Sequence, residues 1–233
     1  ANLPAGLLPR LTGELGAEVT PEAFLGYVHG LLGTSAYGQR FADELGEGAG
    51  PARVPLTSDG ALFERVSAFG RELLWWHTWG ERFAPNGSTG LPEGSARSID
   101  PIVGYPEKYS FDPSSMKLTV GTGSFGPVSP EVWAFEVSGL KALQSWLGNR
   151  MAAGKGKKSS PLDDIRPTRW TFTDELLQLL AILEHTVEVT PLAAELLAEV
   201  LAGRYGVTQA PLVVANILAH VLVDFFAQGL AAT

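Results

Sequence analysis

The residues best suited to chemistry form a group of cations between Gly154 and Arg169. The run Gly-Lys-Gly-Lys-Lys-Ser-Ser ends at Ser160, and two arginines follow it closely. Lysine and arginine bind phosphate oxygens, serine hydroxyls can anchor a phosphate backbone, and glycine allows a close approach that larger side chains would block. We therefore predict that this stretch docks on phosphate groups through Lys155, Lys157, Lys158, Ser159, Ser160, Arg166 and Arg169.

The charge distribution leaves two interpretations of this stretch. The net charge of −8 argues against a generic nucleic-acid binder. From Lys141 to Arg169, however, seven basic residues stand against two acidic ones, a local charge of +5 that leaves −13 for the rest. A basic region on an acidic body is compatible with a phosphate-binding face. It is equally compatible with a solvated loop whose lysines serve solubility.

Residues for catalysis or metal binding are sparse. The chain has no cysteine, and none of its four histidines has metal-ligand spacing to another. The run Gly121–Gly126 lacks the Lys-Ser/Thr ending of a phosphate-binding loop. One enzymatic alternative remains, a carboxylate site using Asp163, Asp164 or Glu131.

Hydrophobic spacing predicts the elements that position these residues. The fold class is α+β, with bundle-like helical flanks around a small, mainly antiparallel β-sheet between residues 102 and 137. We expect strands near Ile102–Val103, 108–111, 117–120 and 132–135. We expect helices at 21–45, 59–79, 139–150 and 173–203, the last restarting at Thr190-Pro191. We expect one composite domain with three parts, residues 1–83, 84–170 and 171–233. Residues 84–101, at the start of the second part, are rich in Gly, Ser and Pro.

The aromatic end of the helix at 59–79 allows two interpretations. Trp75, Trp76, His77 and Trp79 lie within five positions. They could form a platform on which bases stack, or they could close the hydrophobic core.

The chain ends also carry expectations. No secretory signal is visible at the start and cysteines are absent, which suits a reducing cytoplasm. The first residue is Ala1 and not Met, which is typical of a processed product or of a piece of a longer polypeptide. The apolar stretch Val207–Leu230 contains Pro211 and Asp224, which favour a buried or partner-bound helix over a membrane span. We therefore expect no membrane partner.

An ordered set of segments resembles one known family. The segments are Tyr27–Leu45, Arg53–Leu56, Gly70–Phe83, Phe125–Trp133 and Lys157–Ile165, and the resemblance covers roughly residues 1 to 203. Together they resemble the C-terminal specificity domain of Type ISP restriction-modification enzymes. Those enzymes join a nuclease, a helicase-like motor, an adenine methyltransferase and target recognition in one polypeptide. The stretch after Gly203 matches none of these segments.

The resemblance implies a role in reading a short asymmetric sequence of double-stranded DNA for a neighbouring methyltransferase domain. It implies that S-adenosylmethionine binds to that domain and that this chain needs no cofactor. The chain contains no Asn/Asp-Pro-Pro-Tyr/Phe motif and no Walker motif, so we expect it to be non-catalytic. Base reading is expected at Lys108, Lys117 or Gln144. A protein-interaction module that docks through its acidic helices and apolar tail remains the alternative.

Overall fold

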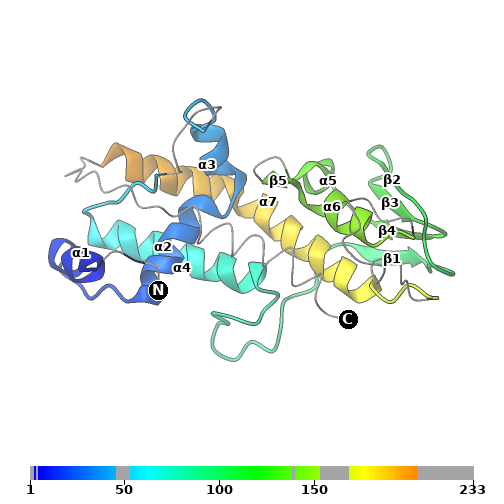
Figure 1. Ribbon diagram of the computed structural model, residues 1–233, viewed down its shortest axis with the longest axis horizontal. Coiled ribbons are helices and arrows are strands. Elements are labelled where there is room, and N and C mark those ends of the chain that lie inside the picture. The colour runs from blue at the N-terminus through cyan, green and yellow to red at the C-terminus, as the bar shows by residue number, and fades with distance from the viewer. Residues whose placement is uncertain (1–2, 4, 46–52, 138–139, 153–167, 204–233) are drawn as a thin grey trace. The chain divides into compact units, whose positions relative to one another are not determined.

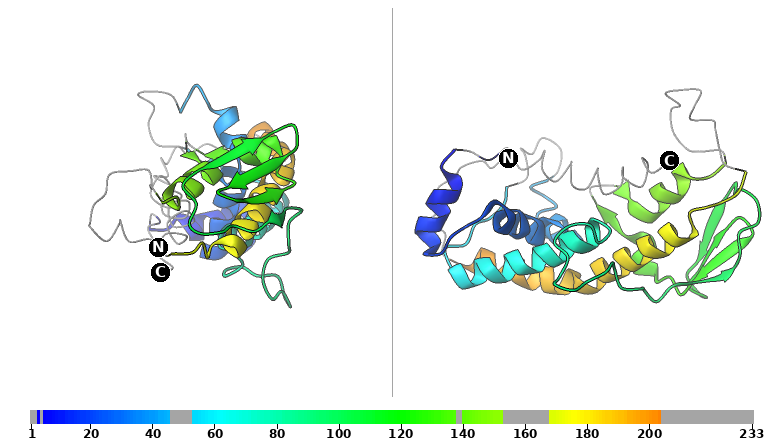
Figure 2. Two further views of the ribbon diagram at one scale, coloured as in Figure 1. Left: turned by 90° about the vertical axis from the view of Figure 1, so that its right-hand side faces the viewer. Right: turned by 90° about the horizontal axis from the view of Figure 1, so that it is seen from below.

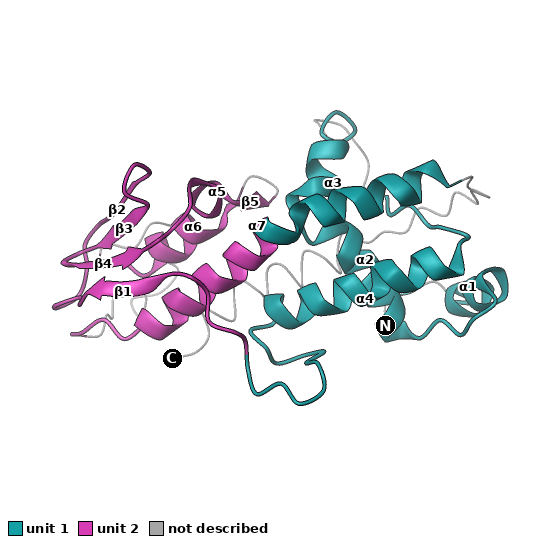
Figure 3. Ribbon diagram, turned by 180° about the vertical axis from the view of Figure 1, so that it is seen from behind, with its two compact units in different colours: residues 1–90, 188–233 teal, residues 91–187 magenta. Residues whose placement is uncertain are grey.

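The chain divides into two compact units. The structure is a computed structural model that describes residues 3, 5–45, 53–137, 140–152 and 168–203 (Figure 1). Unit 1 comprises residues 1–90 and 188–233, and unit 2 comprises residues 91–187 (Figure 3). The division near residue 90 falls inside the stretch rich in Gly, Ser and Pro. The long helix α7 (Thr173–Ala202) contributes its first half to unit 2 and its second half to unit 1.

Unit 1 is helical. Its helices are α1 (Leu7–Leu15), α2 (Pro21–Leu32), α3 (Ser35–Arg40), α4 (Gly60–His77) and the second half of α7. Helix α2 begins where the sequence predicts, because the Thr20 hydroxyl accepts a hydrogen bond from the Ala23 N–H at 3.1 Å. The Asp59 carboxylate caps α4 in the same way, accepting from the backbone N–H groups of residues 61 and 62.

Helices α2 and α4 touch through their backbones. A Cβ atom at Gly70 would overlap the carbonyl oxygen of Gly26 and would lie 2.5 Å from the amide nitrogen of Gly30. Only glycine therefore fits at this crossing. The crossing lets Tyr27 and Leu73 become fully buried in the core of unit 1.

The aromatic end of α4 belongs to the protein interior. Trp75, Trp76 and His77 are all buried, and Nδ1 of His77 lies 2.9 Å from Nε2 of the buried His29. Buried side chains offer no exposed surface on which a base could stack. Of the two interpretations of this cluster, the structure supports the core for these three residues.

Unit 2 contains the small antiparallel sheet that the sequence predicts. Its strands are β1 (Arg97–Asp100), β2 (Tyr109–Asp112), β3 (Lys117–Val120) and β4 (Gly123–Gly126), in the spatial order β1-β4-β3-β2. All three pairings are antiparallel. A separate two-stranded ribbon joins β5 (Glu136–Val137) to β6 (Leu140–Lys141).

The two faces of the sheet differ. Leu118 and Val120 of β3 and Phe125 of β4 are fully buried. Helices α5 (Pro130–Ala134) and α6 (Ala142–Asn149) and the first half of α7 lie on this side of the sheet (Figure 2). Because side chains alternate along a strand, Lys117 and Thr119 point to the opposite face.

Three local predictions are wrong. The strand expected at Ile102–Val103 lies earlier, at β1, and the stretch 132–135 is mostly the helix α5. Ser129 begins that helix, since its hydroxyl accepts from the Val132 N–H at 3.2 Å and a proline occupies the first helical position. Helix α7 also does not restart at Thr190-Pro191 but continues through Pro191. A proline there removes one backbone donor, and packing of the helix outweighs that loss.

Helix α7 is long and apolar enough, by length and composition, to cross a membrane. The core helix of a globular protein passes the same test. Its residues Leu176, Leu180 and Leu183 are buried in the protein.

Candidate nucleic-acid interface

One end of the four-stranded sheet of unit 2 gathers several segments that are distant in sequence. We call this region the loop end and define it as residues 103–108, 121–122, 152 and 168–170. The turn between β3 and β4 connects two of its parts. The Gly121 N–H donates to the Lys108 carbonyl at 2.9 Å, and the Thr122 hydroxyl oxygen accepts from the Val103 N–H at 2.8 Å.

The other parts of the loop end are held by backbone hydrogen bonds to one short segment. The Ala152 N–H donates to the Pro106 carbonyl at 2.8 Å, and the Trp170 N–H donates to the Gly104 carbonyl at 3.2 Å. Ala152 and Trp170 are therefore both held at the loop end.

All seven predicted phosphate-binding residues lie between these two anchors in the sequence. Six of them are outside the described residues: Lys155, Lys157, Lys158, Ser159, Ser160 and Arg166. The flanking anchors are described, however. They connect both ends of this stretch to Gly104 and Pro106, two residues apart in the same segment.

The structure brings two of the remaining predicted site residues together. Lys108 and Arg169 are both exposed at the loop end. Arg169 adjoins Trp170, whose N–H binds the segment that leads into Lys108. The exposed Glu107 is an acidic neighbour in that segment. Two exposed cations on one rigid end of a sheet can contact phosphates, and a carboxylate beside them can accept from a base amino group.

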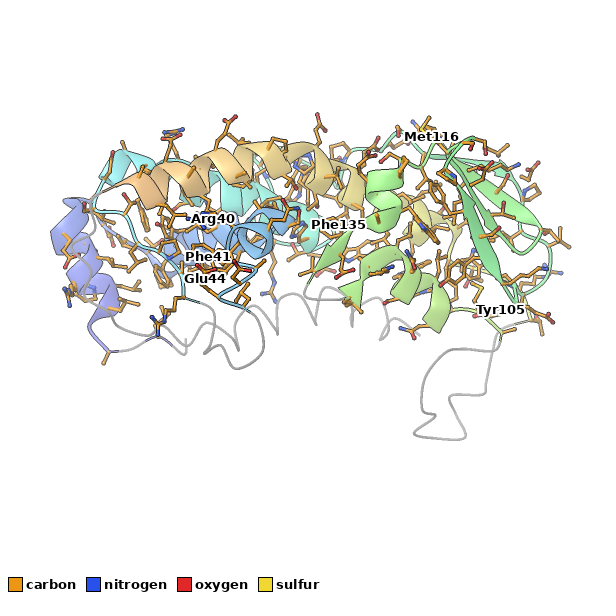
Figure 4. All side chains as sticks on the ribbon, turned by 90° about the horizontal axis from the view of Figure 1, so that it is seen from above. Arg40, Phe41, Glu44, Tyr105, Met116 and Phe135 are labelled. Atoms are coloured by element: carbon orange, nitrogen blue, oxygen red, sulfur yellow. The ribbon has the colours of Figure 1, made fainter. Side chains whose placement is uncertain are left out.

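Lys117 lies at the opposite end of the sheet. It follows Met116, and Figure 4 shows Met116 and Tyr105 at opposite ends of the strands. Lys117 pairs in register with Asp112, which puts its Cα about 14 Å along the strands from that of Lys108. Its ammonium nitrogen lies 3.5 Å from a carboxylate oxygen of Asp100.

Asp100 is held by two partners on this outer face. The Ser124 hydroxyl donates to the carboxylate at 2.5 Å, and this hydrogen bond, followed by the charge of Lys117, lowers the pKa of Asp100. The carboxylate therefore stays ionised and keeps Lys117 partnered. An exposed ion pair of this kind is weak, so Lys117 can exchange Asp100 for another anion at little cost.

Gln144 has its side chain engaged within the protein. It lies on α6 and is half-buried, and its amide donates to the Trp133 carbonyl at 3.3 Å. The backbone carbonyl of Gln144 accepts from the hydroxyl of Tyr109, the residue after Lys108, at 3.0 Å. Gln144 thus contributes to the support of β2.

A buried arginine underlies the loop end, and no sequence pattern distinguishes it from the other cations of the basic region. The Arg150 side chain is 6% exposed, and its guanidinium carbon lies 3.9 Å from the centre of the Trp146 ring. Burial lowers the pKa of Arg150, and the charge of Glu175, 3.7 Å away, partly offsets this effect. The guanidinium also faces Phe172, at 5.1 Å.

This aromatic cluster joins α6 to the loop end. The Trp146 ring contacts Trp170 edge to face, with 6.2 Å between ring centres, and Trp170 contacts Tyr105 at 6.1 Å. Arg150 stacks on Trp146 and stands two residues before the anchor Ala152. The cluster therefore fixes the geometry of both chain anchors from below.

Sequence reasoning also missed the segment from Val103 to Pro106 as part of the site. The sequence feature that could have indicated this segment is its turn residues, which interrupt any strand here: Pro101, Gly104 and Pro106. Gly104 adopts a φ of +74°, which favours glycine.

The residues considered for catalysis gain no support from geometry. Glu131 is exposed in the first turn of α5, a position where an acidic residue stabilises a helix. Asp163 and Asp164 lie outside the described residues. Within the part of the chain that the structure describes, no three His, Asp or Glu side chains are grouped to hold a metal ion.

Comparison with known proteins gives a family. The family model described as the Type ISP C-terminal specificity domain matches residues 1–181, which include all of unit 1 before α7 and most of unit 2. No match is found among curated proteins or among solved structures. The matched region contains the sheet, the loop end and the predicted basic stretch, and on this match the chain belongs to the family of Type ISP C-terminal specificity domains.

Proposed function

We propose that this chain is the DNA target-recognition module of a Type ISP restriction-modification enzyme, and that the loop end of unit 2 faces the duplex. Family membership supports the recognition role. The observation that carries the assignment of the surface is the pair of backbone anchors, Ala152 to Pro106 and Trp170 to Gly104. These anchors attach the two ends of a stretch with five further cations to the segment that leads into Lys108.

The charge of unit 2 agrees with this surface. Unit 2 contains ten of the seventeen Lys and Arg residues against eleven Asp and Glu, whereas the rest of the chain has seven against fourteen. An acidic protein that binds DNA through one face needs its positive charges concentrated there. The negative charges on the rest of its surface repel the phosphates and so keep the duplex in one orientation.

Phosphate contacts are assigned to Lys155, Lys157, Lys158, Arg166 and Arg169, with Ser159 and Ser160 anchoring the DNA backbone. Base contacts are assigned to Lys108. Lys117 and Gln144 stay further candidates, which would have to leave the Asp100 carboxylate and the Trp133 carbonyl to reach a base. The segregation of roles follows the usual division, in which phosphate contacts fix the register and base contacts select the sequence.

Catalysis is assigned to the rest of the parent polypeptide. S-adenosylmethionine would bind to its methyltransferase domain, which is also the proposed intramolecular partner of this chain in the cytoplasm. The recognition module itself needs only to hold the target in register for that domain.

The experiment is a titration of labelled duplex DNA with the 233-residue chain at several salt concentrations. If about four phosphates are neutralised, log affinity should fall against log salt with a slope of about −4. Absence of binding at low salt, or binding with no salt dependence, would overturn the proposal.

A further inference from the structure

Val103 is an apolar side chain held out into solvent. It is 73% exposed, more than the exposed residues Ile99 and Met116 of the same unit. A single exposed valine is ordinary on a protein surface, so exposure alone carries no argument. Two further features distinguish Val103: its backbone is fixed, and exposed cations lie in the neighbouring segments.

The backbone on both sides of Val103 is fixed. Its N–H donates to the Thr122 hydroxyl oxygen at 2.8 Å, and the next residue, Gly104, accepts from the Trp170 N–H. The preceding Ile102 packs so closely against Gly123 that a Cβ atom added to Gly123 would clash with Ile102. A β-branched side chain on a fixed backbone has few rotamers, so little conformational entropy is lost when it makes a contact.

Two exposed cations, Lys108 and Arg169, lie in segments whose backbones are bonded to the residues around Val103. Gly104, its neighbour, is hydrogen-bonded to Trp170, which adjoins Arg169. Lys108 is bonded to Gly121, the residue before the Thr122 that holds Val103. An apolar group on the same end of the sheet as exposed cations suits a DNA groove, where base edges lie beside phosphates.

We infer that Val103 contacts the C5-methyl group of a thymine in the major groove, beside the base edge that Lys108 reads, while Arg169 faces a bordering phosphate. The thymine methyl is the apolar group that the major groove presents to a protein, and apolar side chains recognise it. The inference rests on the proposed function, since it names a base contact for the same surface. It makes Val103 a specificity-determining residue that favours thymine over cytosine.

Ile99 provides a matched control. It is also an exposed aliphatic residue, at 57%, but it lies on β1, where its Cδ1 atom packs near Gly126 at the far end of β4. The inference requires that Val103 and Ile99 behave differently although both are exposed and both can be truncated without opening a cavity.

The experiment first selects duplexes from a pool with a randomised core by binding to the 233-residue chain. In the selected duplex each thymine is then replaced by deoxyuridine, which lacks only the methyl group. At one position this change should weaken binding about fourfold, the effect expected for one methyl group removed from a contact. With Val103→Ala the same replacement should cause no loss, whereas Ile99→Ala should keep the fourfold loss.

Val103→Ala should also leave the salt slope unchanged, because no phosphate contact is removed. The inference is overturned if the wild-type chain selects a sequence but no thymine shows a loss that depends on Val103; the proposed function then stands. If the pool yields no selected sequence and binding lacks salt dependence, the proposed function fails and the inference fails with it.

Discussion

The backbone amide of Trp170 donates a hydrogen bond of 3.2 Å to the carbonyl oxygen of Gly104. This single contact brings the segment of Arg169 against the segment of Val103, although Arg169 and Gly104 are 65 positions apart in the sequence. Backbone hydrogen bonds of this kind hold the loop end together. Its geometry also depends on the buried side chains beneath it.

Arg150→Ala is expected to lower the free energy of unfolding by about 2 kcal/mol, because a buried guanidinium loses its stacking on Trp146 and its pairing with Glu175. Arg150→Lys should recover little, since an ammonium lacks the planar stacking surface. Urea unfolding gives the stability. The exposed Lys141→Ala serves as the control and should be close to neutral; equal losses in both variants would contradict the role given to Arg150.

Gly70→Ala is expected to destabilise the chain by about 3 kcal/mol, because its new methyl group would overlap the Gly26 carbonyl oxygen at the crossing of α2 and α4. Gly13→Ala in α1 meets no atom within 4 Å and should instead stabilise by about 0.5 kcal/mol. Thermal unfolding of the two variants tests the pair. A mild effect at Gly70 would show that the helices do not pack backbone to backbone.

Stability should depend on pH through His29. Burial lowers the pKa of His29 from 6.5 to about 4, so between these values the unfolded chain binds a proton that the folded chain does not. The contribution of His29 to the unfolding free energy is therefore constant above pH 6.5 and declines by about 3 kcal/mol as the pH falls to 4.

Urea unfolding of the wild type and of His29→Gln between pH 7.5 and 4.5 measures this contribution. The difference between the unfolding free energies of the two proteins should change with pH in this window. Parallel curves would show that His29 is not held neutral in the folded protein.

The isolated chain is expected to transfer no methyl group from S-adenosylmethionine to DNA, because the Asn/Asp-Pro-Pro-Tyr/Phe motif is absent from its sequence. Incorporation of labelled methyl into duplex DNA is the measurement, with the parent polypeptide as the positive control. Incorporation of labelled methyl by the purified chain would contradict the proposal that it recognises DNA without catalysing methyl transfer.

Much of the fold was predictable because its signals are local. Thr20 and Asp59 cap helices that also carry apolar stripes, and β2 and β3 flank a turn at Asp112. The strand β4 was missed because glycines begin and end it. Gly123 is required by the close approach of Ile102, a tertiary contact that no local pattern reveals.

The candidate site was less predictable for the same reason. Exposed cations such as Lys108 and Arg169 can be read from composition, but their proximity arises from hydrogen bonds between distant backbone groups. Arg150 looks like one more cation of a basic stretch, and its burial against Trp146 follows only from tertiary packing.

The most direct measurement is the salt dependence of duplex binding by a chain with Lys157→Ala and Lys158→Ala combined. The slope should become shallower by about 2, and affinity should fall by a similar factor for all sequences, because two phosphate contacts are removed. The control combines Arg10→Ala and Arg40→Ala, which changes the net charge equally at two exposed positions of unit 1 and should leave the slope unchanged. Unchanged affinity and slope in the Lys157/Lys158 variant, with DNA binding retained, would show that the basic stretch is a solvated connector and would contradict the account.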